Sequence, residues 1–177
     1  VTGTALTSAN NLTINNSAGL TLSATTSVTG TLTLTSGKLT TNGNVLTLSN
    51  AVSGASATNY IVADATGVLT CNNIFTARVC PIGTSISYTP LTITAPSATN
   101  YSVYTTSTFP CTPSDATKMV NLAWGISGVN SPSSVIFQWN AGNQAASFSP
   151  VTSCDLGRYN AACPYTITNI GSATGSG

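Results

Sequence analysis

Apolar residues alternate with threonine in short segments along the first 70 residues of the chain. The clearest segments are Leu12–Ile14, Leu20–Leu22, Leu32–Leu34 and Leu46–Leu48. A period of two is typical of a β-strand with one buried face, and threonine favours strands. Turn-forming residues such as Asn42-Gly43 separate the segments. This region is therefore predicted to consist of short strands joined by tight turns.

A longer period of about 20 residues overlies this alternation. Leu12 corresponds to Leu32 and Leu20 to Leu39, and a weaker third unit begins near Tyr60. Repeats of this length predict the stacked coils of a β-solenoid. A meander of hairpins is the alternative, and the Asn-Gly turn favours it locally.

From about residue 72 the pattern changes, because proline and aromatic residues appear and turns separate the candidate strands. These candidates are Ser85–Tyr88, Leu91–Thr94, Tyr101–Thr105, Met119–Ile126, Ser134–Trp139 and Tyr165–Ile170. Regularly spaced short strands predict an antiparallel β-sandwich. We therefore expect an all-β protein, with a threonine-rich β-repeat region over residues 1–71 and a β-sandwich with a Ser/Gly-rich tail over residues 72–177.

Charged residues are scarce, since the 177 residues include four Lys/Arg, three Asp/Glu and no His. Enzymes transfer protons with titratable groups held close together, whereas Asp64, Asp115 and Asp155 are far apart in the sequence. Without histidine, a catalytic triad and the usual zinc sites cannot be assembled. The net charge of +1 gives no basic surface for nucleic acid, and no apolar run is long enough to span a membrane. We therefore expect neither an enzyme nor a cofactor, metal or nucleic-acid site.

Five cysteines without a CxxC motif indicate disulfides in an oxidising, extracellular setting. Cys71 with Cys80 and Cys154 with Cys163 are the natural local pairs, because each closes a short loop. Cys111 is left over in this pairing. It is predicted to be either a buried free thiol or the site of an intermolecular bond.

Several short motifs occur in order along the chain: Tyr60–Asp64, Gly67–Thr70, Arg78–Gly83, Tyr88–Pro90, Asn121–Ile126, Phe137–Asn140 and Gly157–Tyr159. Their order resembles a module of secreted surface proteins of Bacteroidota exported by the type IX pathway, in which a threonine-rich β-repeat precedes a sandwich. Two features depart from that pattern. Cys80 stands where such modules usually have an aromatic or aliphatic residue, and the C-terminal sorting domain is missing, as expected after its removal on export or in a truncated chain. The resemblance implies an extracellular or cell-surface location and an adhesive or structural role.

The composition indicates a protein that associates with copies of itself. A nearly uncharged surface causes little repulsion between copies, and residues 1–15 contain neither the lysine nor the proline that usually protects exposed sheet edges. We therefore expect a structural subunit of an extracellular filament or fibre that polymerises head to tail.

Addition of the N-terminal strand to a neighbouring copy is the expected mechanism of polymerisation. Residues 1–15, when extended, span about 50 Å, and a domain of this size is about 40 Å wide. The apolar contacts of this strand are expected to be Leu6, Leu12, Ile14 and Leu20. End-to-end stacking of solenoid coils is the alternative geometry.

An adhesin or carbohydrate-binding module from a larger cell-surface protein is the alternative function, with surface glycans as its partners. Its sugar-stacking platform would be built from the aromatic residues Tyr101, Tyr104, Trp124, Trp139 and Tyr159. The alternation of Trp124 with Leu122 and Ile126 favours a place in the sandwich core instead.

Overall fold

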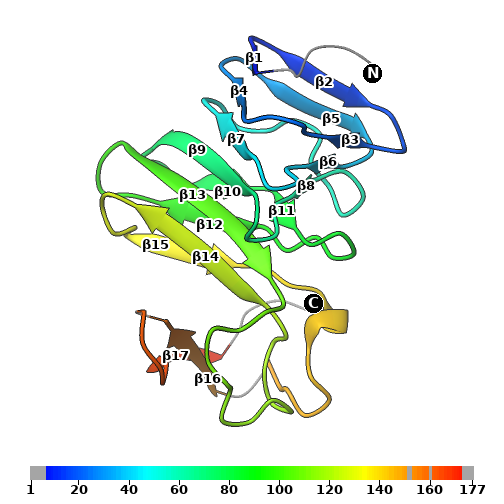
Figure 1. Ribbon diagram of the computed structural model, residues 1–177. Coiled ribbons are helices and arrows are strands. Elements are labelled where there is room, and N and C mark those ends of the chain that lie inside the picture. Colours follow the sequence, from blue (N-terminus) through cyan, green and yellow to red (C-terminus); the bar gives the residue numbers. More distant parts are fainter. Residues whose placement is uncertain (1–6, 151–152, 160, 173–177) are drawn as a thin grey trace. The chain divides into compact units, whose positions relative to one another are not determined.

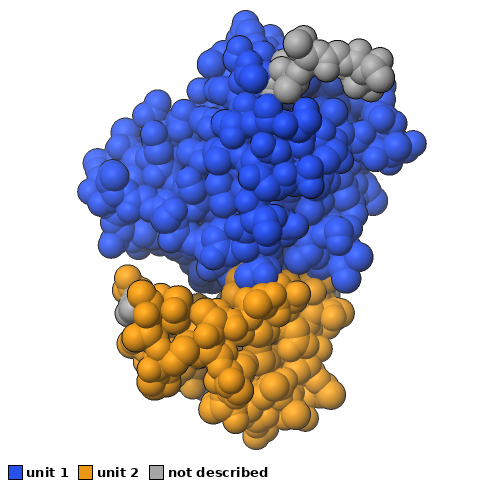
Figure 2. Space-filling model, viewed as in Figure 1, with its two compact units in different colours: residues 1–106, 124–138 blue, residues 107–123, 139–177 orange. Residues whose placement is uncertain are grey.

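The computed structural model describes residues 7–150, 153–159 and 161–172. The chain forms two compact units, which Figure 2 shows in different colours. Unit 1 comprises residues 1–106 and 124–138, and unit 2 comprises residues 107–123 and 139–177. Residue 71, where the change in sequence pattern is expected to end the first region, lies inside the strand β9 (Val68–Ile74).

Unit 1 begins as a β-solenoid with three parallel ladders (Figure 1). The first ladder consists of β1 (Ser8–Ala9), β4 (Thr26–Val28), β7 (Val45–Leu48) and β9. The second ladder consists of β2 (Leu12–Asn15) and β5 (Leu32–Ser36), and a parallel bridge from Thr33 to Ser53 continues it. The third ladder consists of β3 (Leu20–Thr21), β6 (Leu39–Thr40), β8 (Ile61–Val62) and β11 (Ile82–Gly83). We number the coils 1 to 4, over residues 8–22, 26–41, 45–63 and 68–83.

The register of these ladders confirms the 20-residue repeat expected from the sequence. Leu12 pairs with Leu32, and Leu20 pairs with Leu39. The Asn-Gly turn at residues 42–43 does not form a hairpin, because it connects β6 to β7, which belong to different ladders. Asn44 fixes this corner by donating a hydrogen bond from Nδ2 to the Leu22 carbonyl of coil 1 at 3.2 Å.

The alternation of apolar and hydroxyl residues places aliphatic columns inside the solenoid. One column consists of Leu20, Leu39, Ile61 and Ile82, which stack in register in the third ladder. Complete burial of such a side chain stabilises the fold by about 1.5–3 kcal/mol. On the first ladder, hydroxyl residues pair in register from strand to strand, as Ser8, Ser27, Thr47, Thr70 and Ser102.

The solenoid passes directly into an antiparallel sandwich within unit 1. Strand β13 (Thr99–Thr106) pairs antiparallel with β9, and β14 (Ala123–Gly128) follows it, so the first ladder becomes a six-stranded sheet. The second sheet contains β10 (Arg78–Cys80), β12 (Leu91–Thr94) and β15 (Ser134–Phe137), all antiparallel. Trp124 and Phe137 join the two sheets with ring centroids 5.0 Å apart. The expected order of a β-repeat followed by antiparallel sheets is confirmed.

One expected strand is wrong. Residues 85–88 form a turn, in which the Thr84 N–H donates to the Ser87 carbonyl at 2.9 Å and the Ser87 N–H donates to Thr84 Oγ1 at 3.1 Å. Threonine and serine satisfy backbone groups in turns as readily as they occupy strands, so the polar–apolar alternation was misleading here.

Unit 2 contains the antiparallel pair β16 (Ser153–Arg158) and β17 (Thr166–Ser172), together with a short 3-10 turn, η1 (Ala141–Asn143). Its buried apolar residues, among those described, are Cys111 and Leu122. Leu156, Ile167 and Ile170 of the hairpin are exposed. The unit therefore has a small apolar core for its length.

None of the helical structure in the described residues has the length and apolar character needed to cross a membrane.

Candidate interface at the open end of the solenoid

Among the described residues, strands β1, β2 and β3 are the end strands of their ladders. In coil 1, the carbonyls of Thr7 and Ala9 accept hydrogen bonds from Ser27 and Thr29 of coil 2, both at 3.0 Å. Because backbone groups of alternate residues point to opposite sides of a strand, the N–H and C=O groups of Ser8 point away from coil 2. We call this face of coil 1 the open end.

The same reasoning applies to the other two strands of coil 1. The Leu12 N–H donates to the Thr31 carbonyl at 3.0 Å, and the Leu20 N–H donates to the Lys38 carbonyl at 2.8 Å. The backbone groups of Thr13 and Thr21 therefore face the open end. Each of the three ladders thus presents donors and acceptors there.

At the opposite end of the solenoid, the chain itself covers the first and third ladders. On β11, the Ile82 carbonyl accepts a hydrogen bond from the Thr89 N–H at 3.0 Å, so the turn at residues 84–89 covers this strand. On the first ladder, β13 covers β9. The two ends of the solenoid therefore present different surfaces.

Two apolar side chains of coil 1 are less buried than their counterparts in coil 2, whereas Ile14 and Leu22 of coil 1 are 4% and 3% exposed. Leu32 and Leu39 of coil 2 are 2% and 0% exposed, whereas their counterparts Leu12 and Leu20 are only partly buried. The first charged residue of the chain is Lys38, and the first proline is Pro81. Solenoids usually end in coils with a polar outer face, and sheet edges are usually protected by lysine or proline. Residues 8–22 of coil 1 contain neither lysine nor proline.

The structure brings together three of the four interface residues expected from the sequence. Leu12, Ile14 and Leu20 all lie in coil 1, where they pack onto coil 2 of the same chain. Leu6 lies outside the described residues. Residues 7–15 are thus part of the chain's own solenoid.

Tight corners hold coil 1 on coil 2. Gly37 has a φ of 84°, and a Cβ at this position would overlap the Asn16 carbonyl of coil 1. Asn59 of coil 3 accepts a hydrogen bond from the Gly37 N–H at 3.0 Å. Only glycine combines this left-handed backbone with such close stacking.

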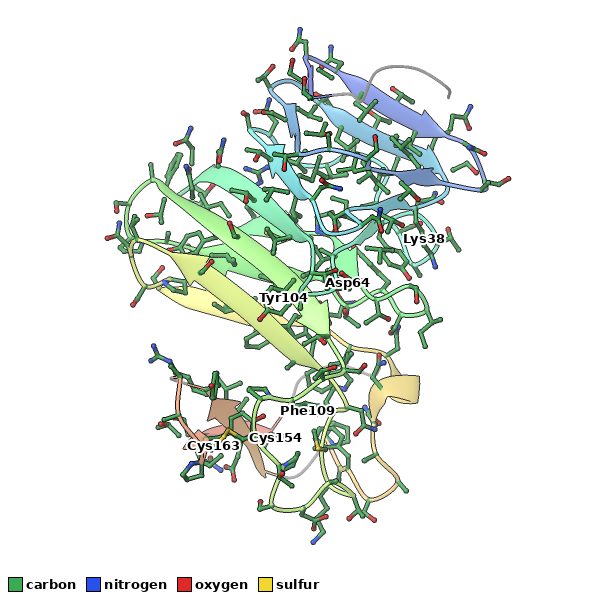
Figure 3. All side chains as sticks on the ribbon, in the orientation of Figure 1. Lys38, Asp64, Tyr104, Phe109, Cys154 and Cys163 are labelled. Atoms are coloured by element: carbon green, nitrogen blue, oxygen red, sulfur yellow. A yellow bond between two sulfur atoms is a disulfide. The ribbon has the colours of Figure 1, made fainter. Side chains whose placement is uncertain are left out.

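The two cations of unit 1 bind backbone carbonyls. Lys38 Nζ donates to the Ser85 carbonyl at 2.6 Å and lies 4.8 Å from the centre of the Tyr60 ring; Figure 3 labels it. Arg78 donates to the carbonyls of Asn72 at 2.8 Å, Ser49 at 3.3 Å and Leu48 at 3.4 Å, and also to that of Asn50. In a chain with so few acids, carbonyl groups replace carboxylates as partners for the guanidinium.

A groove lies beside Arg78, with a volume of about 410 Å³. It runs between the segment after coil 3's β7 and the segment around β10, and its walls are formed by residues Ala51, Val52, Ala55, Thr76, Ala77, Arg78, Val79 and Pro81. No pattern in the sequence indicates this groove. The groove exists because β10, which follows β9 in coil 4, pairs with β12 and does not extend the second ladder.

The cysteines correct part of the expected pairing. Cys111 is bonded to Cys163, with Cα atoms 5.7 Å apart, so the expected Cys154–Cys163 pair and the free or intermolecular Cys111 are wrong. Cys154 is the odd cysteine of unit 2; Figure 3 labels it and Cys163. The error arose because pairing by sequence proximity ignores the fold. Tyr165 Oη donates to the Cys111 carbonyl at 3.1 Å and so joins segments 54 residues apart.

Cys71 and Cys80 lie close together, as the sequence suggested, but as thiols. Both are buried, and the Cys80 thiol donates a hydrogen bond to Cys71 Sγ at 3.2 Å. This bond lowers the pKa of Cys71, against the effect of burial and with the help of the Arg78 charge. The same bond and burial raise the pKa of Cys80 well above its ordinary value.

The aromatic residues do not form one exposed row. Tyr101 is fully buried, and Tyr104 and Trp124 pack against the core of unit 1. In unit 2, Trp139 packs on Phe148 and Tyr159 on Tyr165, with ring centroids 6.0 and 6.5 Å apart.

Each of the three acids has a nearby polar partner. Asp64 accepts a hydrogen bond from Thr66 at 2.8 Å, and Asp155 accepts one from Asn169 at 2.9 Å. Asp115 accepts from the Thr117 hydroxyl at 2.6 Å and lies 3.2 Å from Lys118 Nζ. These interactions order turns and strand pairs.

No protein-family model matches this sequence, and comparisons with curated proteins and with solved structures find no similar chain.

Proposed function

We propose that this protein is a structural subunit of an extracellular filament or fibre, and that copies join head to tail through the open end of the solenoid. The observation that carries the proposal is that β1, β2 and β3 all end their ladders without charge or proline. Unprotected edges of this kind pair readily with another chain.

The difference between the two ends of the solenoid supports an open polymer. A contact between two different surfaces is heterologous, and it extends indefinitely unless the rotation between copies closes a ring. The net charge of +1 leaves little repulsion between copies. The cysteine bond of unit 2 is compatible with an extracellular location.

Electron microscopy and sedimentation of the purified chain test this proposal. We expect filaments of uniform width from the unmodified chain. Proline at Thr13 and Thr21 removes two N–H groups that face the open end and that coil 2 does not use, so the double variant should fold and remain monomeric. Alanine at the same two positions keeps both N–H groups and should leave polymerisation intact.

Two results would contradict the proposal. Dispersed monomers of the unmodified chain at high concentration would remove it. Filaments of the double proline variant that match those of the alanine control would show that the open end is not the contact.

A further inference from the structure

We propose that the groove beside Arg78 binds the N-terminal segment, residues 1–6, of a neighbouring copy. This inference rests on the proposed polymer and names the receiving surface. The groove lies at the end of the second ladder opposite to β2, because the ladder runs from β2 through β5 to Ser53.

The wall formed by Val52 is suited to an extended segment. The Ser53 N–H donates to the Leu32 carbonyl, and the Ser53 carbonyl accepts from the Leu34 N–H, both at 2.9 Å. Ser53 therefore faces β5, and the backbone groups of Val52 point to the groove side. An added strand can form main-chain hydrogen bonds with such an edge and place side chains in adjacent pockets.

The chemistry of the groove suits an uncharged segment with small side chains. Three alanines, Val52, Val79 and Pro81 supply most of its lining. Arg78, which also lines the groove, donates hydrogen bonds to the chain's own Asn72 and Leu48 carbonyls. Val79 is 49% exposed, and the neighbouring Phe75 is 61% exposed. Val79 therefore offers an exposed apolar side chain on the groove wall.

Residues 1–6 match these requirements. Their sequence, Val-Thr-Gly-Thr-Ala-Leu, is uncharged and offers Leu6 as the largest apolar side chain. Six extended residues span about 20 Å. They immediately precede Thr7, which is bound to Ser27 at the open end. The donor thus leaves from the open end of the solenoid, beside β1 of the first ladder, and the acceptor lies at the opposite end of the second ladder. A head-to-tail contact requires a donor and an acceptor at opposite ends.

Cross-linking tests the contact without relying on filaments. Both partners carry Cys154→Ser to remove the odd cysteine of unit 2. One partner carries Leu6→Cys and the other Ala77→Cys, at an exposed position of the groove wall. Mixing them under mild oxidation should give a covalent dimer of twice the 17.8 kDa chain. Ala98→Cys, at an exposed turn of the same unit, is the matched control. It should give at least about tenfold less dimer, because a bound segment raises the effective concentration of its thiol only beside the groove.

Filling the groove gives an independent readout. Ala77→Trp should raise the concentration needed for polymerisation at least about tenfold, whereas Ala98→Trp should not change it. Leu6→Asp should raise the concentration needed for polymerisation as Ala77→Trp does. Leu6→Ile, which keeps an apolar side chain, should polymerise like the unmodified chain.

The outcomes separate this inference from the proposed function. Filaments that form equally well with Ala77→Trp, together with no cross-link above the Ala98 control, would overturn the groove contact and leave the filament intact. A cross-link found only within a chain that carries both Leu6→Cys and Ala77→Cys would assign the segment to its own groove and would also overturn the inference. Absence of filaments in the unmodified chain would contradict the proposed function instead.

Discussion

The sulfur atoms of Cys71 and Cys80 lie 3.2 Å apart and connect β9 of the six-stranded sheet with β10 of the second sheet. Both thiols are buried. A bond between them would staple the two layers of the sandwich at the point where the solenoid ends.

We predict that a disulfide oxidant such as oxidised glutathione converts this pair to an intramolecular disulfide. Because both thiols are buried, a local opening must admit the oxidant. Cys71, whose pKa is lowered by the hydrogen bond from Cys80, is then the thiol expected to attack. Two protons and two electrons leave the pair, and glutathione disulfide is reduced to two thiols. The loop is short, so the bond should add about 2–3 kcal/mol to the free energy of unfolding.

Intact mass and thermal unfolding check this prediction. The oxidised chain should lose the mass of two hydrogen atoms and melt at a higher temperature. Cys71→Ser should show neither change, and Cys154→Ser should show both. A chain that gains the mass of glutathione and never loses the mass of two hydrogen atoms would contradict the prediction.

The Cys111–Cys163 bond is predicted to stabilise the folded state of unit 2 and to have little effect on that of unit 1. The bond joins residues 52 apart in a unit with few buried apolar side chains, and a loop of that length corresponds to about 4 kcal/mol in the chain-entropy account. Limited proteolysis of Cys163→Ser should cut within unit 2 and leave residues 7–106 protected. Equal resistance of both units, with and without the bond, would contradict this role.

Replacement of Gly37 by alanine is expected to destabilise the chain more than the same change at Gly43. Both residues have a φ near 80°, so both variants carry the strain of a left-handed alanine, about 1–2 kcal/mol. Only at Gly37 does the added methyl group overlap a backbone carbonyl, since nothing lies within 4 Å of it at Gly43. Denaturant unfolding measures the difference, and equal losses at the two sites would refute the stacking argument.

The pKa of Asp115 is predicted to rise when Thr117 is replaced by valine. The hydrogen bonds from the Thr117 hydroxyl and backbone N–H, followed by Lys118, hold the pKa of this carboxyl below its ordinary value of 3.8. A carboxyl with a lowered folded-state pKa contributes stability above 3.8 and loses it as the pH falls through the folded-state pKa. An NMR titration of the side-chain carboxyl carbon measures the shift, and an unchanged pKa in the variant would contradict the assignment.

The solenoid could be predicted from sequence because each coil repeats the positions of the one before. Leu12 with Leu32 and Leu20 with Leu39 are equivalent in sequence, and parallel stacking makes them neighbours in space. The turn that suggested a hairpin could not be interpreted locally. Whether Asn42-Gly43 reverses the chain within one sheet or turns a corner between two depends on the ladder that the next strand joins.

Features that depend on tertiary contact were not accessible to the same reasoning. The partner of Cys163 lies 52 residues away and is brought near by the folding of unit 2. The groove arises because β10 leaves the solenoid to pair with β12, and no periodicity in the sequence marks that departure. The binding of backbone carbonyls by Arg78 had one indication in the sequence. Arg78 stands next to an apolar strand in a chain that has few acids to pair with it.

The coils of the solenoid are also expected to differ in local stability. In a stacked array each coil is stabilised by its neighbours, so coil 1, with one neighbouring coil, is held less firmly than coil 2 or coil 3. Amide hydrogens should therefore exchange with solvent fastest in coil 1 and progressively more slowly toward the sandwich. Binding of a second copy would supply the missing neighbour, so that the softest part of the free subunit becomes an interior part of the assembled fibre.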